Sequence, residues 1–111
     1  MAREQLQTLT EPMYFILLTL TRPMHGYEIM QTVAEISDGR VKVGAGTLYA
    51  LLTRFEKEKI VVLVRDDGRR KTYELTEKGR ELLDREYTRL KQGIEAYENY
   101  LERRFNDEGE I

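Results

Sequence analysis

The sequence contains no cysteine, no tryptophan and only one histidine. Without thiols, a disulfide framework and a thiolate metal site are excluded, and His25 cannot complete a metal site alone. A glycine-rich phosphate loop is also absent, and the carboxylates are scattered over segments typical of solvated helices. Because an enzyme needs convergent acids, bases or nucleophiles, we expect no catalytic site, no cofactor and no metal.

Long hydrophobic runs are absent as well. The longest apolar stretch, Met13 to Leu20, is interrupted by Thr19 and is far shorter than the roughly 20 residues of a membrane-spanning helix. The first residues lack the basic segment and apolar core of a signal peptide. We therefore expect a cytoplasmic protein that does not enter a membrane, and its 111 residues provide one domain's worth of chain.

Charged residues are abundant but unevenly distributed along the chain. Residues 1–39 carry 2 basic and 5 acidic side chains, residues 40–80 carry 11 and 6, and residues 81–111 carry 5 and 9. The overall net charge of −2 thus conceals a middle segment of +5 between ends of −3 and −4. A positive charge localised in one segment is typical of a nucleic-acid-binding motif.

Two helices are predicted in the first third of the chain. The run Thr10-Glu11-Pro12 supplies a capping hydroxyl, an acid and a first-turn proline, so a helix begins there and ends before Arg22-Pro23. A second helix is expected from His25-Gly26-Tyr27 to about Ile36. Its buried face, at helical spacing, is expected to carry Ile29, Val33 and Ile36.

His25 stands directly before the second predicted helix. A lone histidine can be a ligand or a pH sensor, but at this position it is more often a hydrogen-bonded structural residue, the interpretation that we favour. A turn at Asp38-Gly39 ends the helix. Beyond the turn, Val41 and Val43 alternate in the manner of a short edge strand.

The third predicted helix, from about Ala45 to Lys57 or Glu58, is the candidate DNA-recognition element. One face carries the core pattern i, i+3, i+4, i+7 with Leu48, Leu51, Leu52 and Phe55. The opposite face is small and basic, which suits a helix in a major groove, because slim side chains permit close approach and cations meet phosphates or base edges. An ordinary solvated face is the alternative. The expected contact residues are Thr47, Tyr49, Ala50, Thr53, Arg54 and Lys57.

A hairpin with a cationic tip is predicted after the third helix. The runs Val61–Val64 and Lys71–Leu75 have strand character, and Asp66-Asp67-Gly68 supplies the turn between them. Such a hairpin beside a recognition helix forms a wing whose cations contact phosphates or a minor groove. A turn that merely aids solubility is the alternative. The three cations at the tip are Arg69, Arg70 and Lys71.

The last predicted helix begins after Thr76 and continues to about Phe105. Its apolar residues alternate spacings of four and three, the heptad pattern of a coiled coil. Gly93 weakens this helix by about 1 kcal/mol relative to alanine. One small domain cannot cover so long a stripe, so we expect a second copy of the chain to cover it, with packing against its own domain as the alternative. The stripe consists of Leu83, Tyr87, Leu90, Ile94, Tyr97 and Leu101.

The predicted fold class is mostly α, of the α+β type. The order helix, hairpin, helix predicts a winged helix-turn-helix with a long C-terminal dimerisation helix. Residues 1–76 are expected to form the DNA-binding domain, with the N-terminal helix included. Residues 77–111 are expected to form the dimerisation helix and its tail.

Four motifs occur in order along the chain: His25-Gly26-Tyr27-Glu28-Ile29, Gly46-Thr47-Leu48-Tyr49, Gly68-Arg69-Arg70-Lys71-Thr72-Tyr73 and Leu75-Thr76-Glu77-Lys78-Gly79. Together, at these spacings, they resemble the PadR family of bacterial transcription regulators, over residues 10 to 105. The resemblance implies a winged helix-turn-helix and a homodimer joined through the C-terminal helix. It also implies repression that a small ligand, often aromatic or cationic, relieves. In this family Tyr49 would contact the DNA backbone, and Arg69, Arg70 and Lys71 would form the basic cluster of the wing.

The sequence departs from the family pattern at two positions. Ala50 stands where many members have proline, which leaves the start of the third helix less rigid. Leu90 stands roughly where some members use an aromatic side chain to stack a flat ligand. A small apolar or aromatic effector is still expected at the seam, with simple seam packing of the tyrosines as the alternative. The expected effector pocket consists of Met13, Tyr87, Leu90, Ile94 and Tyr97.

The expected function is that of a homodimeric, sequence-specific repressor that an effector releases from DNA. Two recognition helices and two wings would straddle a pseudo-palindromic operator in double-stranded DNA. The alternative is a winged-helix protein-interaction module that binds no DNA. The positive middle segment favours the repressor.

Overall fold

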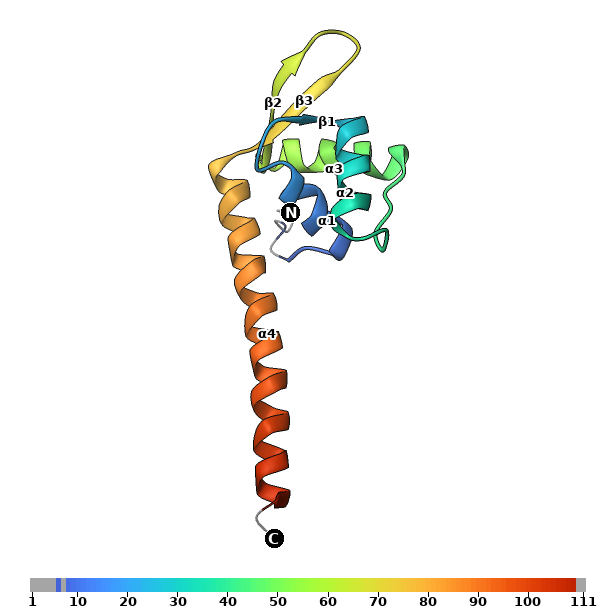
Figure 1. Cartoon of the computed structure of the whole chain (residues 1–111). Helices are drawn as coiled ribbons and strands as arrows, with labels where there is room; N and C mark the ends of the chain where they lie inside the picture. The colour runs from blue at the N-terminus through green and yellow to red at the C-terminus, as the bar shows by residue number, and fades with distance from the viewer. Residues whose placement is uncertain (1–5, 7, 110–111) are drawn as a thin grey trace.

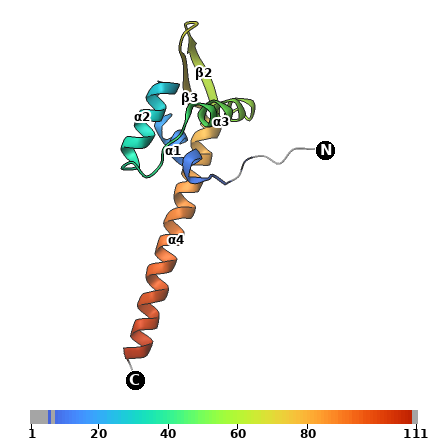
Figure 2. The same cartoon turned by 90° about the vertical axis from the view of Figure 1, so that its right-hand side faces the viewer.

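The computed structural model describes residues 6 and 8–109 of the chain (Figure 1). These residues form a small helical body with a three-stranded antiparallel sheet, from which the last helix projects (Figures 1 and 2). The predicted fold class is therefore confirmed. In chain order the elements are α1 (Glu11–Thr19), β1 (Met24–His25), α2 (Gly26–Ile36), α3 (Ala45–Lys57), β2 (Val61–Asp66), β3 (Lys71–Leu75) and α4 (Glu77–Gly109).

The sheet has the strand order β1-β3-β2. Strands β2 and β3 form the predicted hairpin, with an irregularity in register between Leu63 and Arg65. Strand β1 pairs with β3 on the other side, where Met24 lies opposite Tyr73. The sequence pattern misses β1 because a strand of two residues is too short to show alternation.

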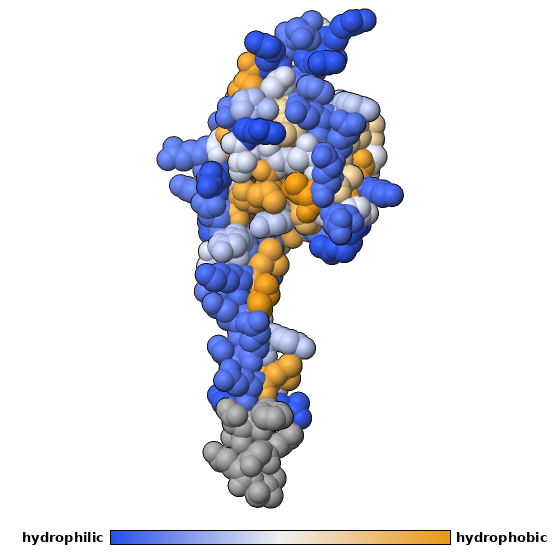
Figure 3. All heavy atoms as spheres, viewed as in Figure 1, coloured by the Kyte–Doolittle hydropathy of each residue, from blue (hydrophilic) through white to orange (hydrophobic). Residues whose placement is uncertain are grey.

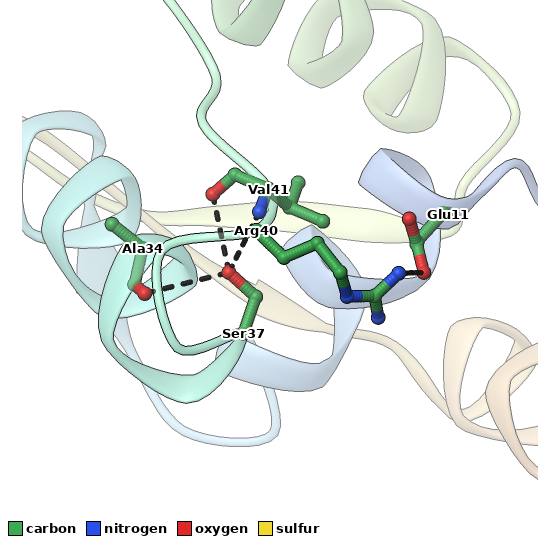
Figure 4. Close-up of polar contacts among 5 residues, drawn as sticks. All are labelled: Glu11, Ala34, Ser37, Arg40 and Val41. Carbon is green, nitrogen blue, oxygen red and sulfur yellow. Dashed lines mark hydrogen bonds and ion pairs between the residues drawn. The ribbon is translucent and has the colours of Figure 1, made fainter.

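The strand expected at Val41 and Val43 does not form, although both side chains are buried. The Ser37 hydroxyl accepts the Val41 N–H at 3.0 Å and lies 3.2 Å from the Val41 carbonyl oxygen and 3.4 Å from that of Ala34 (Figure 4). Because a side chain already bonds these backbone groups, the segment closes as a loop after α2 instead of joining the sheet.

Polar caps start the first two helices at the predicted positions. Thr10 Oγ1 accepts the Met13 N–H at 3.4 Å, and His25 Nδ1 accepts the Glu28 N–H at 3.4 Å. His25 is therefore hydrogen-bonded at the start of α2, as favoured from the sequence. Helix α2 ends at Ile36 as expected, but Ile36 is 46% exposed and does not join the buried face.

The hydrophobic core lies between α1, α2, α3, the sheet and the first turns of α4. Burial of these apolar side chains supplies the main driving force for folding. The confirmed core face of α3 contributes three of them. Among the largest fully buried side chains are Phe55, Leu48, Leu52, Ile16, Leu17 and Ile29.

The junction between α3 and α4 is closed by hydrogen bonds of Thr76. Thr76 Oγ1 donates to the Lys59 carbonyl at 2.6 Å, and the Thr76 N–H donates to the Ile60 carbonyl at 3.0 Å. Thr76 Oγ1 also accepts the Gly79 N–H at 3.0 Å and thereby caps α4. One threonine thus satisfies carbonyls beyond the end of α3 and starts the next helix.

Gly79 lies buried directly against this junction. A Cβ at this position would lie 2.1 Å from the Ile60 carbonyl oxygen and 2.9 Å from Leu75 Cδ2. The backbone of α4 can approach so closely only because residue 79 has no side chain. Beside it, Lys78 Nζ donates to the Glu58 carbonyl at 2.8 Å.

The first turns of α4 belong to the core of the body. Leu82 and Leu83 are 3% and 4% exposed. Leu83 is therefore a correction to the predicted dimer seam, because its side chain is already covered by its own chain. Glu86 is 3% exposed, and its carboxylate accepts a hydrogen bond from Arg89 Nε at 3.1 Å.

Beyond Glu86, α4 projects away from the body (Figure 2), and all residues from 87 to 104 are exposed. The helix continues to Gly109, slightly further than the predicted end near Phe105. Among the described residues, no helix combines the length and the apolar content that crossing a bilayer requires.

Replacing Gly79 with alanine is expected to lower the free energy of unfolding by about 1–3 kcal/mol, the usual cost of overpacking, because the new methyl group would meet the Ile60 carbonyl. The matched control is Gly93→Ala on the same helix, where nothing lies within 4 Å of the added Cβ. The control should raise stability by up to about 1 kcal/mol. Urea denaturation followed by circular dichroism at one protein concentration measures both. Equal effects of the two substitutions would contradict the close approach at Gly79.

Candidate nucleic-acid interface

The outer face of α3 is exposed along its whole length, while its inner face is buried in the core. Tyr49 is 47% exposed, and the Thr53 hydroxyl donates to the Tyr49 carbonyl at 2.8 Å. The hydroxyl hydrogen of Thr53 is therefore used within the helix. All six residues predicted on this face are exposed: Thr47, Tyr49, Ala50, Thr53, Arg54 and Lys57.

Arg54 is partly neutralised by a neighbouring carboxylate. Its Nε lies 2.9 Å from Glu58 Oε2, an i,i+4 ion pair. Burial by itself raises the pKa of Glu58, but hydrogen bonds from the Leu6 N–H and from Arg54 outweigh it and hold that pKa below its ordinary value. Glu58 is therefore ionised at neutral pH, and Arg54 offers less free charge than Lys57 at the exposed end of α3.

Two aspartates order the tip of the wing formed by β2 and β3. Asp66 Oδ1 accepts the N–H of Gly68, a residue in the left-handed region with φ +88°, at 3.0 Å. Asp67 Oδ1 accepts the N–H groups of Arg70 at 2.8 Å and of Arg69 at 3.2 Å. These two N–H groups lower the pKa of Asp67 below its ordinary value. The carboxylates bond the backbone of the tip, while the arginine side chains remain exposed.

A hollow of about 250 Å³ lies between the start of α2, Tyr49 of α3 (Ala45–Lys57) and the wing. We refer to it as the α2–wing hollow. It brings Tyr49 together with the three cations of the wing, which are far apart in the sequence. None of its lining residues is acidic. They are His25, Gly26, Tyr27, Tyr49, Arg69, Arg70 and Lys71.

Three of these lining residues, His25, Gly26 and Tyr27, are absent from the predicted contact residues. A Cβ on Gly26 would lie 2.3 Å from Tyr49 Oη and 2.8 Å from Tyr49 Cζ, so the tyrosine ring rests against the glycine. The motif His25-Gly26-Tyr27 could have indicated that these residues belong to the site. Spacing along the chain, however, does not reveal that residue 26 lies against residue 49. The other five α3 residues predicted to contact DNA lie outside the hollow.

An exposed apolar stripe follows the projecting part of α4, where hydrophobic side chains line one edge of the helix (Figure 3). Each of its predicted members except Leu83 is between 41% and 67% exposed. The described chain leaves these side chains exposed, which is unusual for so many large apolar groups on one helix face. The exposed members are Tyr87, Leu90, Ile94, Tyr97 and Leu101.

A cavity of about 390 Å³ lies between α1, the loop after α2, and α4. We refer to it as the α1–α4 cavity. It is not the predicted effector pocket, because only Leu90 of the five expected residues lines it. Met13 packs against the core, and Tyr87, Ile94 and Tyr97 lie on α4 outside the cavity. The lining residues are Leu9, Thr10, Glu11, Tyr14, Phe15, Arg40, Glu86, Arg89 and Leu90.

Two ion pairs stand on the walls of the α1–α4 cavity. Arg40 Nη1 lies 2.5 Å from Glu11 Oε2, which joins the loop before α3 to the start of α1 (Figure 4). On the other wall, Arg89 lowers the pKa of Glu86, and a backbone hydrogen bond from Leu9 acts in the same direction against the effect of burial. The cavity therefore combines an apolar lining with paired charges.

Known proteins are similar to this chain in sequence and in fold. A family model described as the transcriptional regulator PadR-like family matches residues 16–85. An uncharacterized 37.1 kDa protein of transposon Tn4556 from Streptomyces fradiae is 41% identical over 64 residues, which cover 58% of this chain and 18% of that protein. The chain thus spans less than a fifth of that relative's length.

Two further proteins match most of the chain. An uncharacterized protein X from Lysinibacillus sphaericus is 30% identical over 92 residues, which cover 77% of this chain and 84% of that protein. The solved structure of a PadR-like transcription factor from Bacteroides fragilis superposes with a TM-score of 0.63 at 30% identity, and covers 78% of this chain and 86% of that one.

Replacing Asp67 with alanine is expected to loosen the wing tip without unfolding the protein, because the substitution removes the acceptor for the Arg69 and Arg70 N–H groups. Amide hydrogen exchange at these two residues should accelerate, while Asp84→Ala on α4 serves as the control. Since the folded-state pKa of Asp67 is lowered, the wild-type tip is ordered above the ordinary value near 3.8 and loses this order as pH falls through the folded-state pKa. Unchanged exchange at residues 69 and 70 would contradict the assigned role of Asp67.

Proposed function

Because the chain belongs to the PadR-like family of transcriptional regulators, we propose that this DNA-binding regulator acts as a homodimeric repressor released by a small molecule. The observation that carries the proposal is the α2–wing hollow. It joins Tyr49 of α3 to the three cations of the wing, with no carboxylate among the lining residues. One residue of the exposed α3 face thus lies together with the positive charge of the wing, an arrangement that supports binding to duplex DNA.

The roles of the two elements in DNA binding follow from their chemistry. The exposed α3 face, with Thr47, Ala50, Thr53 and Lys57, would enter the major groove, where base edges are read. The wing cations would contact phosphates and set the position of the protein on the duplex. Tyr49 of α3 lies beside the wing cations and would contact the DNA backbone.

Homodimerisation is supported by the apolar stripe on α4. Five large side chains are exposed along the projecting helix, and their spacings of four and three match the seam of two paired helices. A second copy of the chain is the natural cover for such a stripe. Residues 1–76 and 77–111 would then serve DNA binding and dimerisation, with the first turns of α4 shared because Leu82, Leu83 and Glu86 are buried in the body.

Release by an effector is supported by the α1–α4 cavity. Its aromatic residues Tyr14 and Phe15 suit a small aromatic or apolar molecule, and their rings meet edge to face at 5.8 Å. Arg40 on its wall is attached to the loop that leads into α3 and pairs with Glu11 of α1. A ligand that displaces this pair would shift the start of α3 and weaken binding to DNA.

Replacing Arg69, Arg70 and Lys71 together with alanine is expected to flatten the salt dependence of DNA binding. The slope of log K against log salt should fall by roughly 0.9 for each phosphate that the variant no longer neutralises. Fluorescence anisotropy with duplex DNA from upstream of the protein's own gene measures the slope. A matched triple variant on α4, Arg85→Ala with Lys91→Ala and Arg103→Ala, controls for total charge.

An unchanged slope in the wing variant would remove the wing from the mechanism. Absence of binding by the wild-type protein to any duplex would instead favour a protein-interaction module. Thermal melting of both triple variants checks that the fold is retained, which is expected because the side chains of Arg69, Arg70 and Lys71 are exposed.

Replacing Ile94 with glutamate is expected to convert the dimer to monomer, because a charge would then lie in the middle of the apolar seam. Ile94 is 60% exposed in the single chain, so its own body does not need it for folding. Gln92→Glu, two residues away on a different helix face, is the matched control. Sedimentation equilibrium measures the mass of each variant. A wild-type protein that is monomeric at micromolar concentration would contradict the proposed homodimer.

A molecule that occupies the α1–α4 cavity is expected to raise the melting temperature, since it binds the folded state only. A thermal-shift screen with phenolic acids and lipophilic cations covers the chemistry of the lining. Leu90→Phe narrows the cavity and should abolish the shift, whereas Leu101→Phe, further along the stripe, should preserve it. A shift that survives Leu90→Phe unchanged would place the ligand elsewhere.

A further inference from the structure

The α2–wing hollow contains more hydrogen-bonding groups than the predicted contact residues supply. Tyr27 is 63% exposed, and its hydroxyl oxygen accepts from Gln31 Nε2 at 3.3 Å. Because Gln31 uses a lone pair of that oxygen, the hydroxyl hydrogen is left to donate to another group. Tyr27 and Tyr49 both line the same hollow, so two phenol groups border one space.

His25 also lines the hollow, and its ring has a nitrogen that can donate a hydrogen bond. Its Nδ1 accepts the Glu28 N–H, so in the neutral ring the proton is on Nε2. The nearest paired carboxylate oxygen, Oε1 of Glu28, lies 3.9 Å from Nε2, beyond hydrogen-bonding distance. Glu28 does not line the hollow.

The side chains that line the hollow indicate which kind of ligand would bind there. Two phenols and an imidazole can each donate a hydrogen bond, and the three wing residues supply positive charge without a compensating carboxylate in the lining. Such a set matches a phosphate, which accepts several hydrogen bonds and carries negative charge. The volume of about 250 Å³ is several times the roughly 30 Å³ of a water molecule, so the hollow can hold a group larger than water.

We infer that the α2–wing hollow is the seat of one phosphate of the DNA backbone in each half-site, held by Tyr27 and His25 together with Tyr49 and the wing cations. The inference rests on the proposed binding to DNA. The occupant is a backbone phosphate because the hollow lies between α3 and the wing, the two elements that approach the duplex.

Gly26 gives the Tyr49 ring the room to lie along this seat. The ring lies where a side chain at residue 26 would stand, with Tyr49 Oη 2.3 Å from the position that a Cβ would take. Alanine at this position would force the ring to swing away and would displace its hydroxyl from the hollow. Gly26 is therefore a positioning residue, which acts through Tyr49 and does not touch the phosphate itself.

The experiment combines protein variants with single neutral phosphates in the DNA. Methylphosphonate is introduced at one backbone position at a time in the duplex from upstream of the protein's own gene, and affinity is measured by anisotropy. Tyr27→Phe and Gly26→Ala are each expected to weaken binding to unmodified DNA by about tenfold, the scale of one hydrogen bond to a charged group. Tyr100→Phe on α4 is the matched control, and circular dichroism confirms that each variant is folded.

In Tyr27→Phe and in Gly26→Ala, methylphosphonate at one particular phosphate of each half-site should reduce the affinity less than it does in the wild-type protein. That phosphate should be the same for both variants, and methylphosphonate at every other position should reduce the affinity as much as in the wild type. This coupling, absent from Tyr100→Phe, is the expected result. Wild-type penalties at all positions in both variants would overturn the phosphate seat and leave DNA binding intact. If the wild-type protein binds no duplex, the proposed function and the phosphate seat are both overturned.

Discussion

The turn after α3 is the point on which the rest of the structure depends. Three successive carbonyls, those of Glu58, Lys59 and Ile60, receive hydrogen bonds from Thr76 and Lys78, and Gly79 allows the backbone of α4 to reach them. From this point α3, the wing and α4 all extend in different directions (Figure 1). These hydrogen bonds satisfy the carbonyls beyond the end of α3 and hold the three elements in a defined relation. The relation between α3, the wing and the projecting helix is therefore set by a few hydrogen bonds to backbone carbonyls.

The distribution of ion pairs explains how a chain of negative net charge can present a positive surface. Arg40, Arg54 and Arg89 are each paired with a glutamate, which lies on α1, at the end of α3 and on α4 respectively. The wing aspartates act differently, because they bond backbone N–H groups and not the arginine side chains. The side chains of Arg69, Arg70 and Lys71 remain exposed beside the α2–wing hollow, whose lining has no acid. Surface ion pairs of this kind add little stability, but they determine where unbalanced charge remains.

Where the local sequence signals were strong, they predicted the helices and strands well. The capping runs at Thr10 and Thr76, the helical spacing of Leu48, Leu52 and Phe55, and the Asp-Gly turn of the wing each depend on neighbouring residues only. The predictions were wrong where distant contacts decided. Val41 and Val43 alternate as in a strand, yet Ser37 bonds the backbone there. Leu83 continues the heptad pattern, yet the body covers it.

The sequence by itself determined the fold class, the positive middle segment and the apolar stripe on the last helix, because periodicity, caps and charge are properties of short segments. Only the tertiary structure decided that Gly26 meets Tyr49, that the start of α2 joins the wing in one hollow, and that the cavity lies between α1 and α4. These contacts link residues far apart in the chain. Their geometry depends on how the elements pack, and no spacing along a single segment encodes it.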